Sequence, residues 1–395
     1  MSEFADRVRS FFESHCKLKP TAQTWGEGAD SLVGSAFRLH EDFPAEVAEA
    51  RAFQRSLFDA GLAWLSGPPD LGGAGASRQE MDQYAQIARD YDRPDTNCLH
   101  VGQQIAAPAI LQFGTEVQRR RWLPSIWRGD LVGCQLFSEP DAGSDLASLR
   151  TRAVRDGDGW RIDGQKVRSS GAHVSDFGEL LARTDDDPAL RHRGLSMFII
   201  DMHTPGVTVR PLRQLNGGSH FCEVYLDNAF IADDRMIGDE GAGWMVAQAS
   251  LTSERDGFGD EDSHLFVHPY ERLVELVAVS GRNDDAVVRD LLADAYTRQT
   301  IARLLPEHLA HARPAIAATG ASLSKLFSTD TDWRLAQQAA TVLGPAITAD
   351  DGSWGRYAWS QMLLGVAAPR IAGGTDEIQR NILAERCLGL PREPR

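Results

Sequence analysis

The spacing of apolar residues changes twice along this chain of 395 residues. Up to about Asp130 they recur every three or four positions, as in the segment VAEARAFQRSL, which is typical of amphipathic helices. From Leu131 to about Met236 they alternate with polar residues in short segments such as WRIDGQKV and VTVRPL, which indicates β-strands. Helical spacing returns after Gly243. The sequence therefore predicts helices, then strands, then helices, in two or three packed units.

Local signals mark where some of these elements begin and end. Thr115 followed by Gln118 predicts a capping box at the start of the helix that carries an arginine run. PPDLGGAG is turn chemistry between two helices. The DGDG run at residues 156–159 lacks the ligand pattern of a calcium loop and predicts a hairpin turn between two strands.

Composition limits the classes of partner and compartment. A net charge of −15 argues against binding to nucleic acid or to an anionic membrane, and no stretch is apolar enough to span a bilayer. The N-terminal segment is amphipathic and mixed in charge, which predicts a helix and not a signal peptide. The cysteines are odd in number and never spaced as CxxC, which favours a reduced, cytoplasmic protein; they are Cys16, Cys98, Cys134, Cys222 and Cys387.

Two distant stretches carry the functional signal. SEPDAGSD at residues 138–145 and IAGGTDEIQRNILAER at residues 371–386 each read as a turn followed by an element whose first backbone N–H groups can bind an anion. Together they resemble the two flavin-contacting signatures of the acyl-CoA dehydrogenases. Three more segments match this family in order: GTEVQRRRWLPSIWRGD, GQKVRSSGAHVSD and EVYLDNAFIADDRMIGDEGAGW. The resemblance covers nearly the whole chain.

The resemblance implies an α+β fold that is mainly helical. It predicts an N-terminal helical domain over residues 1–130, a central β-barrel or sandwich domain over 131–238, and a C-terminal four-helix bundle over 239–395. It also implies assembly into homo- or hetero-oligomers, usually dimers or tetramers, with flavin bound partly across a subunit boundary.

FAD is the cofactor that the resemblance implies. A flavin needs hydrogen-bond donors near N5 and at its pyrimidine edge, and groups that neutralise its pyrophosphate. Ser170 matches the family position whose hydroxyl faces flavin N5, and backbone contacts are expected from Gln135 and Leu136. The remaining cofactor-binding candidates are Ser138, Gly143, Ser144, Arg168, Ser169, Thr375 and Glu377. Thr375 is the predicted N-cap of the last helix, and Gln379 and Arg380 are expected to hold that helix in the bundle.

Three positions depart from the family pattern. Arg168 stands where the family has a tryptophan that covers the flavin ring; a guanidinium can stack on an aromatic plane, but its charge would raise the flavin's affinity for electrons. An exposed arginine on a subunit with a degraded flavin site is the alternative. SHLFVHPYERL at residues 263–273 lacks the Arg and Phe-Gly that reach a neighbouring subunit's cofactor, and Gly344-Pro345 replaces a frequent Gly-Gly.

Acyl-CoA dehydrogenation needs a carboxylate base to remove the proton α to the thioester. In many relatives this carboxylate precedes the Gly-Thr of the C-terminal motif, where this chain has Gly373. The family's second solution is a Glu before an Arg on the first helix after the β domain, and Glu254-Arg255 stands there. Glu254 is therefore the predicted base, on a face shared with Ala247, Ser250 and Leu251, where burial should raise its pKa.

The substrate contacts are predicted from the same motifs. Arg255, Ser144 and Gly373 are the substrate-binding candidates, with Arg255 meeting the CoA moiety. Because CoA is polyanionic, the run Arg119–Arg121 is a further source of cations, although a solvated helix face explains it better. No metal is expected.

The predicted function is FAD-dependent dehydrogenation of an acyl-CoA to a trans-2-enoyl-CoA, with electrons passed to an electron-transfer flavoprotein. One alternative is a non-catalytic or site-completing subunit of a heteromeric acyl-CoA dehydrogenase, as in the branch handling steroid side chains, which the AGGT ending and the Glu-Arg helix resemble. Another is a different flavin reaction on the same fold, such as a monooxygenase or a nitroalkane oxidase. The identity of the acyl group stays open.

Overall fold

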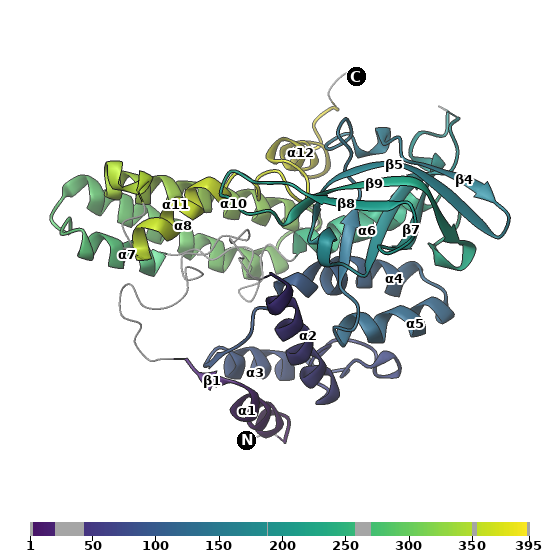
Figure 1. Ribbon diagram of the computed structural model, residues 1–395. Helices are drawn as coiled ribbons and strands as arrows, with labels where there is room; N and C mark the ends of the chain where they lie inside the picture. The colour runs from purple at the N-terminus through teal and green to yellow at the C-terminus, as the bar shows by residue number, and fades with distance from the viewer. Residues whose placement is uncertain (1–2, 20–42, 188, 257–269, 350–353, 393–395) are drawn as a thin grey trace. The chain divides into compact units, whose positions relative to one another are not determined.

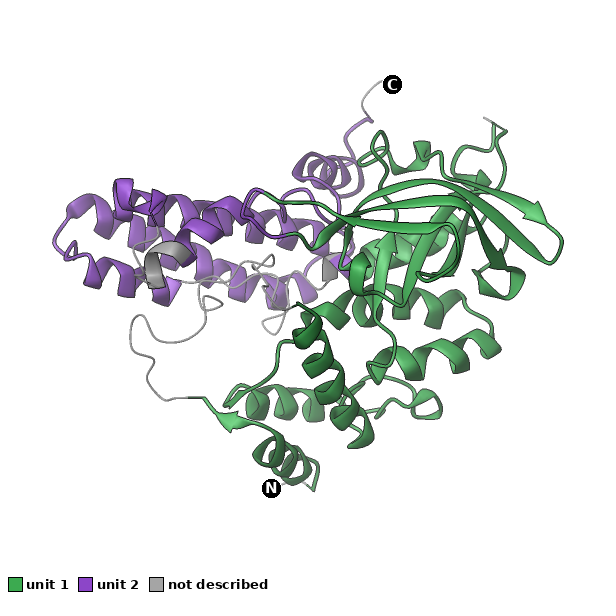
Figure 2. Cartoon of the chain, viewed as in Figure 1, with its two compact units in different colours: residues 1–20, 40–214, 219–253 green, residues 21–39, 215–218, 254–395 purple. Residues whose placement is uncertain are grey.

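The computed structural model describes residues 3–19, 43–187, 189–256, 270–349 and 354–392. Helices occupy the N-terminal and C-terminal parts of the chain, and a sheet lies between them in sequence (Figure 1), which confirms the predicted mainly helical α+β fold. The chain forms two compact units (Figure 2). Unit 1 comprises residues 1–20, 40–214 and 219–253, and unit 2 comprises residues 21–39, 215–218 and 254–395.

The first part of unit 1 is helical, as predicted. Its α-helices are α1 (Glu3–His15), α2 (Phe43–Asp59), α3 (Arg78–Ala88), α4 (Ala107–Phe113) and α5 (Glu116–Trp127). The predicted capping box is present: the Thr115 hydroxyl accepts from the backbone N–H of Gln118 at 3.2 Å, and the Gln118 side chain accepts from that of Thr115 at 2.8 Å. A short pair, β1 (Lys17–Leu18) with β2 (Tyr91–Asp92), was not predicted, because two-residue strands are too short to show alternation.

The central sheet of unit 1 has eight strands. They are β3 (Gly133–Leu136), β4 (Arg152–Asp156), β5 (Gly159–Ser170), β6 (Phe177–Arg183), β7 (Leu195–Asp201), β8 (Val207–Pro211), β9 (Phe221–Ala232) and β10 (Met236–Ile237). Their order is β10-β7-β6-β4-β5-β9-β8, with β3 parallel to β6. The predicted hairpin turn joins β4 to β5, where Asp156 pairs with Gly159.

Both faces of the sheet are covered by apolar residues. Along β6, Leu180 belongs to a core between the strands, whereas Phe177 and Leu181 pack into a second core with helices α4, α5 and α6 (Gly243–Asp256). Strand β6 therefore reads as an almost continuous buried run and not as an alternating one. Helix α6 can approach the sheet because it begins at Gly243, where a Cβ would lie 2.5 Å from the backbone of Ser196.

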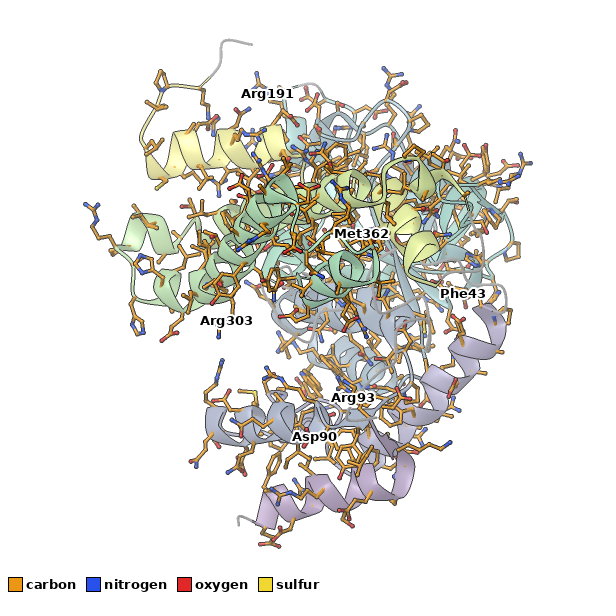
Figure 3. The ribbon with its side chains drawn as sticks, turned by 90° about the vertical axis from the view of Figure 1, so that its left-hand side faces the viewer. Phe43, Asp90, Arg93, Arg191, Arg303 and Met362 are labelled. Atoms are coloured by element: carbon orange, nitrogen blue, oxygen red, sulfur yellow. The ribbon has the colours of Figure 1, made fainter. Side chains whose placement is uncertain are left out.

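Unit 2 is a helical bundle. Its helices are α7 (Tyr270–Val279), α8 (Ala286–Ala310), α9 (Pro314–Ala317), α10 (Gly320–Leu343), α11 (Trp354–Gly365) and α12 (Asp376–Ile382). Helices α7, α8, α10 and α11 share one apolar core, which includes Trp359 and Met362; Met362 is labelled in Figure 3, as is Arg303 on the exposed side of α8. Within the described ranges, no helix has both the length and the apolar content of a membrane span.

Candidate active site

The loop that follows β3 meets the end of β5 within unit 1. The carbonyl oxygen of Ser138 accepts a 2.9 Å hydrogen bond from the backbone N–H of Val167. The next four residues form a turn closed by two backbone hydrogen bonds, 3.0 and 3.2 Å, between Glu139 and Ala142. The structure therefore joins the SEPDAGSD and GQKVRSSG motifs, although 18 residues, 146–163, separate them in sequence.

A β-bulge lies between Val167 and Ser169. Arg168 at the bulge has a positive φ of 60°, which a non-glycine residue rarely adopts, and its side chain is exposed. Its guanidinium lies near the turn, because a Cβ placed on Gly143 would be 3.8 Å from Arg168 Nη1. The bulge leaves Ser169 buried opposite Cys222 and Ser170 half-buried opposite Phe221.

On strands β3 and β5, two buried side-chain donors have no hydrogen-bond partner among the described residues. They are Gln135 Nε2 on β3 and Ser169 Oγ on β5. A buried polar group without a partner costs about 1–3 kcal/mol, so both atoms suit a bound group rich in acceptors, such as a flavin with its pyrophosphate. Gly143 and Ser144 are exposed on the turn, whereas the Leu136 side chain is buried in the sheet core and leaves only backbone groups for a ligand. These residues fit FAD.

The expected anion sites at helix starts are less developed than the sequence suggested. After SEPDAGSD comes a single 3₁₀ turn, Leu146–Ser148, and α12 has only seven residues. Short elements sum few peptide dipoles, so side chains and turn geometry matter more here than helix termini.

The C-terminal motif forms a tight turn before α12 in unit 2. Gly373 and Gly374 both have positive φ, 61° and 93°, and a Cβ on Gly374 would lie 2.7 Å from the side chain of Gln379. Thr375 is the N-cap, as predicted, and its hydroxyl accepts from the backbone N–H of Ile378 at 3.3 Å. Gln379 is buried and donates to the carbonyl oxygens of Gly373 and Gly374 at 2.8 and 3.2 Å, so it fastens the helix as expected.

The exposed side of this helix differs from the expectation. Glu377 is exposed, and hydrogen bonding at the helix start lowers its pKa. Arg380 was expected to hold the helix in the bundle, but it is exposed and lies 3.7 Å from Glu377. That expectation was wrong, because Arg380 lies three residues after Glu377, on the same solvent-facing side of the helix.

A buried lysine anchors the glycine turn. Lys325 on α10 has no exposed surface, and its Nζ donates to the carbonyl oxygens of Arg370 and Gly374 at 3.1 and 3.0 Å and to Asp376 Oδ1 at 3.3 Å. Arg370 donates to the other oxygen of Asp376 at 2.7 Å. Burial lowers the pKa of Lys325, and the charges of Asp376 and Glu254 partly oppose this effect.

Glu254 lies near the end of α6 and is partly buried. The effect of its charge on Lys325 places the Glu254 carboxylate within electrostatic range of the anchored turn in unit 2. On the same helix face, Ala247 and Ser250 are buried, and Ser250 Oγ donates to Oε1 of the buried Glu179 at 2.6 Å. The side chain of Arg255 lies outside the described part of the chain, as does most of the SHLFVHPYERL segment.

The arginine run on α5 is a surface feature. Arg120 lies 2.6 Å from Glu116, and Arg121 lies 3.0 Å from Asp234, in exposed ion pairs. This agrees with the interpretation of the run as a solvated helix face.

Sequence reasoning missed four charged residues that shape the candidate site: Glu139, Lys166, Lys325 and Asp376. The sequence did contain a signal for the burial of Lys166. In the strand WRIDGQKV, Lys166 lies an even number of residues after the buried Trp160 and Ile162, and therefore on the same face. Lys325 lies on a helix whose buried face is itself polar, with Ser322, Thr329 and Asp332, so apolar spacing could not reveal it.

Three domain models of one family match successive parts of the chain. The acyl-CoA dehydrogenase N-terminal domain matches residues 2–130, the middle domain residues 134–229 and the C-terminal domain residues 241–388. The chain belongs to the acyl-CoA dehydrogenase family. It is accordingly an oxidoreductase of the acyl-CoA dehydrogenase type with FAD as its cofactor.

Curated relatives agree with this assignment. The chain is 38% identical over 383 residues to the acyl-CoA dehydrogenase IpdE1 of Mycobacterium tuberculosis, a match that covers 94% of this chain and 97% of that protein. It is also 38% identical over 363 residues to the acyl-CoA dehydrogenase FadE34 of the same organism, covering 90% of this chain and 49% of FadE34.

Solved structures share the fold over the whole chain. The Tcur3481-Tcur3483 steroid ACAD is 26% identical with a TM-score of 0.77, and the match covers 99% of this chain and 97% of that one. The ChsE4-ChsE5 complex from Mycobacterium tuberculosis is 25% identical with a TM-score of 0.73 and the same coverage.

Proposed function

We propose that this chain dehydrogenates an acyl-CoA thioester to its trans-2-enoyl-CoA, with Glu254 as the base that removes the α-proton. The proposal rests on which residue of unit 2 can supply a carboxylate near the C-terminal motif. Gly373 has no side chain, whereas Glu254 is partly buried and lies within electrostatic range of the lysine that anchors the Gly373–Thr375 turn. The chemistry needs one carboxylate, and Glu254 supplies it.

The residues of this chain have separate tasks in the proposal. Glu254 accepts the α-proton on a carboxylate oxygen, and Arg255 binds the CoA moiety. Ser138, Ser144, Ser169, Ser170 and Thr375, with backbone groups of Gln135 and Leu136, hold and orient FAD. FAD, when bound, would supply the redox chemistry as the acceptor of the β-hydride. The partial burial of Glu254 would limit the access of water to its carboxylate.

The relatives support a proposal for the class of acyl group. Similarity to a steroid ACAD supports an acyl group derived from a steroid. We propose an electron-transfer flavoprotein as the acceptor and the cytoplasm as the compartment.

Anaerobic bleaching of the flavin by a panel of acyl-CoAs tests this function. The panel contains straight-chain, branched and steroid-derived thioesters, and bleaching of the FAD absorbance reports substrate oxidation. We expect a ring-bearing thioester to bleach the flavin fastest. A flavin-loaded protein that no member of the panel bleaches would contradict the proposal.

A second candidate function is that of a site-completing subunit in a mixed assembly. The similarity to the ChsE4-ChsE5 complex supports it, as does Arg168 at the family's ring-covering position. Visible spectra of the chain, purified alone and with a co-expressed homologous partner, separate the two functions. FAD bound by the chain alone favours the self-sufficient enzyme, and FAD bound only in the mixed complex favours the subunit.

A further inference from the structure

A buried ion pair lies beneath the junction of the two flavin-contacting segments of unit 1. Lys166 on β5 has no exposed surface, and its Nζ donates to Glu139 Oε1 at 2.9 Å and to the carbonyl oxygen of Phe137 at 3.0 Å. Glu139 is 6% exposed. None of the functions assigned above uses either residue.

The Glu139 carboxylate gathers three stretches of chain at one point. Besides Lys166, it accepts backbone N–H groups from Arg150 at 2.7 Å and from Thr151 at 2.9 Å, where β4 begins. Glu139 itself opens the turn that carries Gly143 and Ser144. One carboxylate therefore closes the loop 138–151 at both ends and ties it to β5.

The neighbours of the pair are the predicted flavin contacts. Ser138 lies between Phe137 and Glu139, the two residues that accept from Lys166, and its own carbonyl accepts from Val167. On β5 the bulge at Arg168 follows two residues after Lys166, and Ser169 and Ser170 come next. The position of Ser138 relative to Ser169 is thus set through Lys166.

Stability alone does not require charges at this point. An ion pair taken out of water gains little over a packed apolar pair of similar volume, because desolvation offsets the attraction. An apolar pair cannot hold two acceptors of the loop at fixed hydrogen-bond distances from strand β5. Directional bonds of this kind preorganise a binding site.

We propose that Lys166 and Glu139 are the positioning pair of the cofactor site, which fixes the 138–151 loop against the Ser169–Ser170 segment so that FAD meets a preformed set of donors. This rests on FAD as the cofactor and not on the role of Glu254. Neither residue touches the reacting atoms.

Equilibrium titration of the apoprotein with FAD, paired with urea unfolding, separates positioning from stability. The variants are Lys166→Met, Glu139→Gln, the double variant, and Glu139→Asp, which keeps the charge but shortens the side chain. Arg51→Met is the control, because it removes a 2.7 Å ion pair to Asp176, six residues beyond Ser170 in unit 1. Where the wild type binds FAD only with a partner subunit, the complex is titrated.

The two readouts should move independently. We expect the single charge-removing variants to have a lower urea midpoint than the wild type. The midpoint of the double variant should return toward the wild-type value, because no charge is left buried without its partner. The affinity for FAD should nevertheless stay lower than in the wild type, by about tenfold or more, in the double variant and in Glu139→Asp. Arg51→Met should lower the urea midpoint with unchanged FAD affinity.

Wild-type FAD affinity in the double variant, or an equal loss of affinity in Arg51→Met, would reduce the pair to a structural one and overturn the inference. A wild type that binds no FAD in any assembly would overturn it as well. Failure of acyl-CoA to bleach a flavin-loaded wild type would contradict the proposed reaction but not the role of Lys166 and Glu139 as a positioning pair.

Discussion

The hydroxyl of Ser250 donates a 2.6 Å hydrogen bond to Oε1 of Glu179, which joins helix α6 to the middle of strand β6. Both residues are buried, at 0% and 1% exposure. Ser250 precedes Glu254 by four residues, one helical turn. This bond therefore fixes the rotation of the helix that carries the proposed base.

Ser250→Ala should destabilise the protein by about 1–3 kcal/mol, because a buried carboxylate oxygen loses a donor. Urea unfolding measures the change. Thr252→Ala is the control on the same helix, since the Thr252 hydroxyl bonds to the carbonyl oxygen of Gln248 and is exposed. An equal loss of stability from the two substitutions would show that the buried hydrogen bond stabilises the protein no more than the exposed one.

Lys166 should make stability rise with pH in the alkaline range. Burial lowers the pKa of Lys166 from 10.5 to about 8, although Glu139 opposes the shift. Between these values the unfolded chain binds the proton that the folded protein has released, so the free energy of unfolding increases with pH. The gain is at most about 1.4 kcal/mol per pKa unit. Urea unfolding of wild type and Lys166→Met from pH 7.5 to 10.5 tests this; parallel curves would contradict it.

Lys325→Met should loosen the glycine turn of unit 2. The substitution removes three hydrogen bonds from a charged donor, to Arg370, Gly374 and Asp376, while Arg370 still pairs with Asp376. We expect a loss of about 2–3 kcal/mol, within the range for bonds to charged groups. Hydrogen exchange of residues 371–379 measures the local effect. Unchanged protection there would show that the lysine does not hold the turn.

Arg168→Gln should lower the reduction potential of bound FAD if the guanidinium faces the flavin, since the substitution removes a positive charge that stabilises added electrons. A spectroelectrochemical titration gives the potential, and FAD affinity serves as the check that the site is intact. An unchanged potential in a flavin-loaded variant would place the Arg168 side chain away from the ring.

The sequence predicted much of the fold because periodicity records burial. The capping box at Thr115, the hairpin turn at Asp156 and the N-cap at Thr375 follow from local chemistry, and the structure confirms each of them. The domain boundaries near residues 130 and 238 stay a prediction, as do the individual roles of the site residues.

What the sequence could not predict depends on contacts between distant segments. Lys166 and Glu139 are 27 positions apart, and Lys325 and Asp376 are 51 apart. The alternation in WRIDGQKV indicates that Lys166 is buried, but no local pattern identifies its partner, because folding brings Glu139 to it from a distant segment. The positive φ of Arg168 also depends on a contact between distant segments, because the bulge is set by the register of β5 with β9.

Stopped-flow bleaching of the Glu254→Gln variant by the best acyl-CoA of the panel tests whether Glu254 removes the α-proton. Glutamine keeps the volume and removes the basicity, so FAD content and the urea midpoint should match wild type. General bases contribute about 10²- to 10⁴-fold in rate, and we predict a loss of flavin bleaching in that range. Bleaching of the flavin-loaded Gln variant at the wild-type rate would show that Glu254 is not the base.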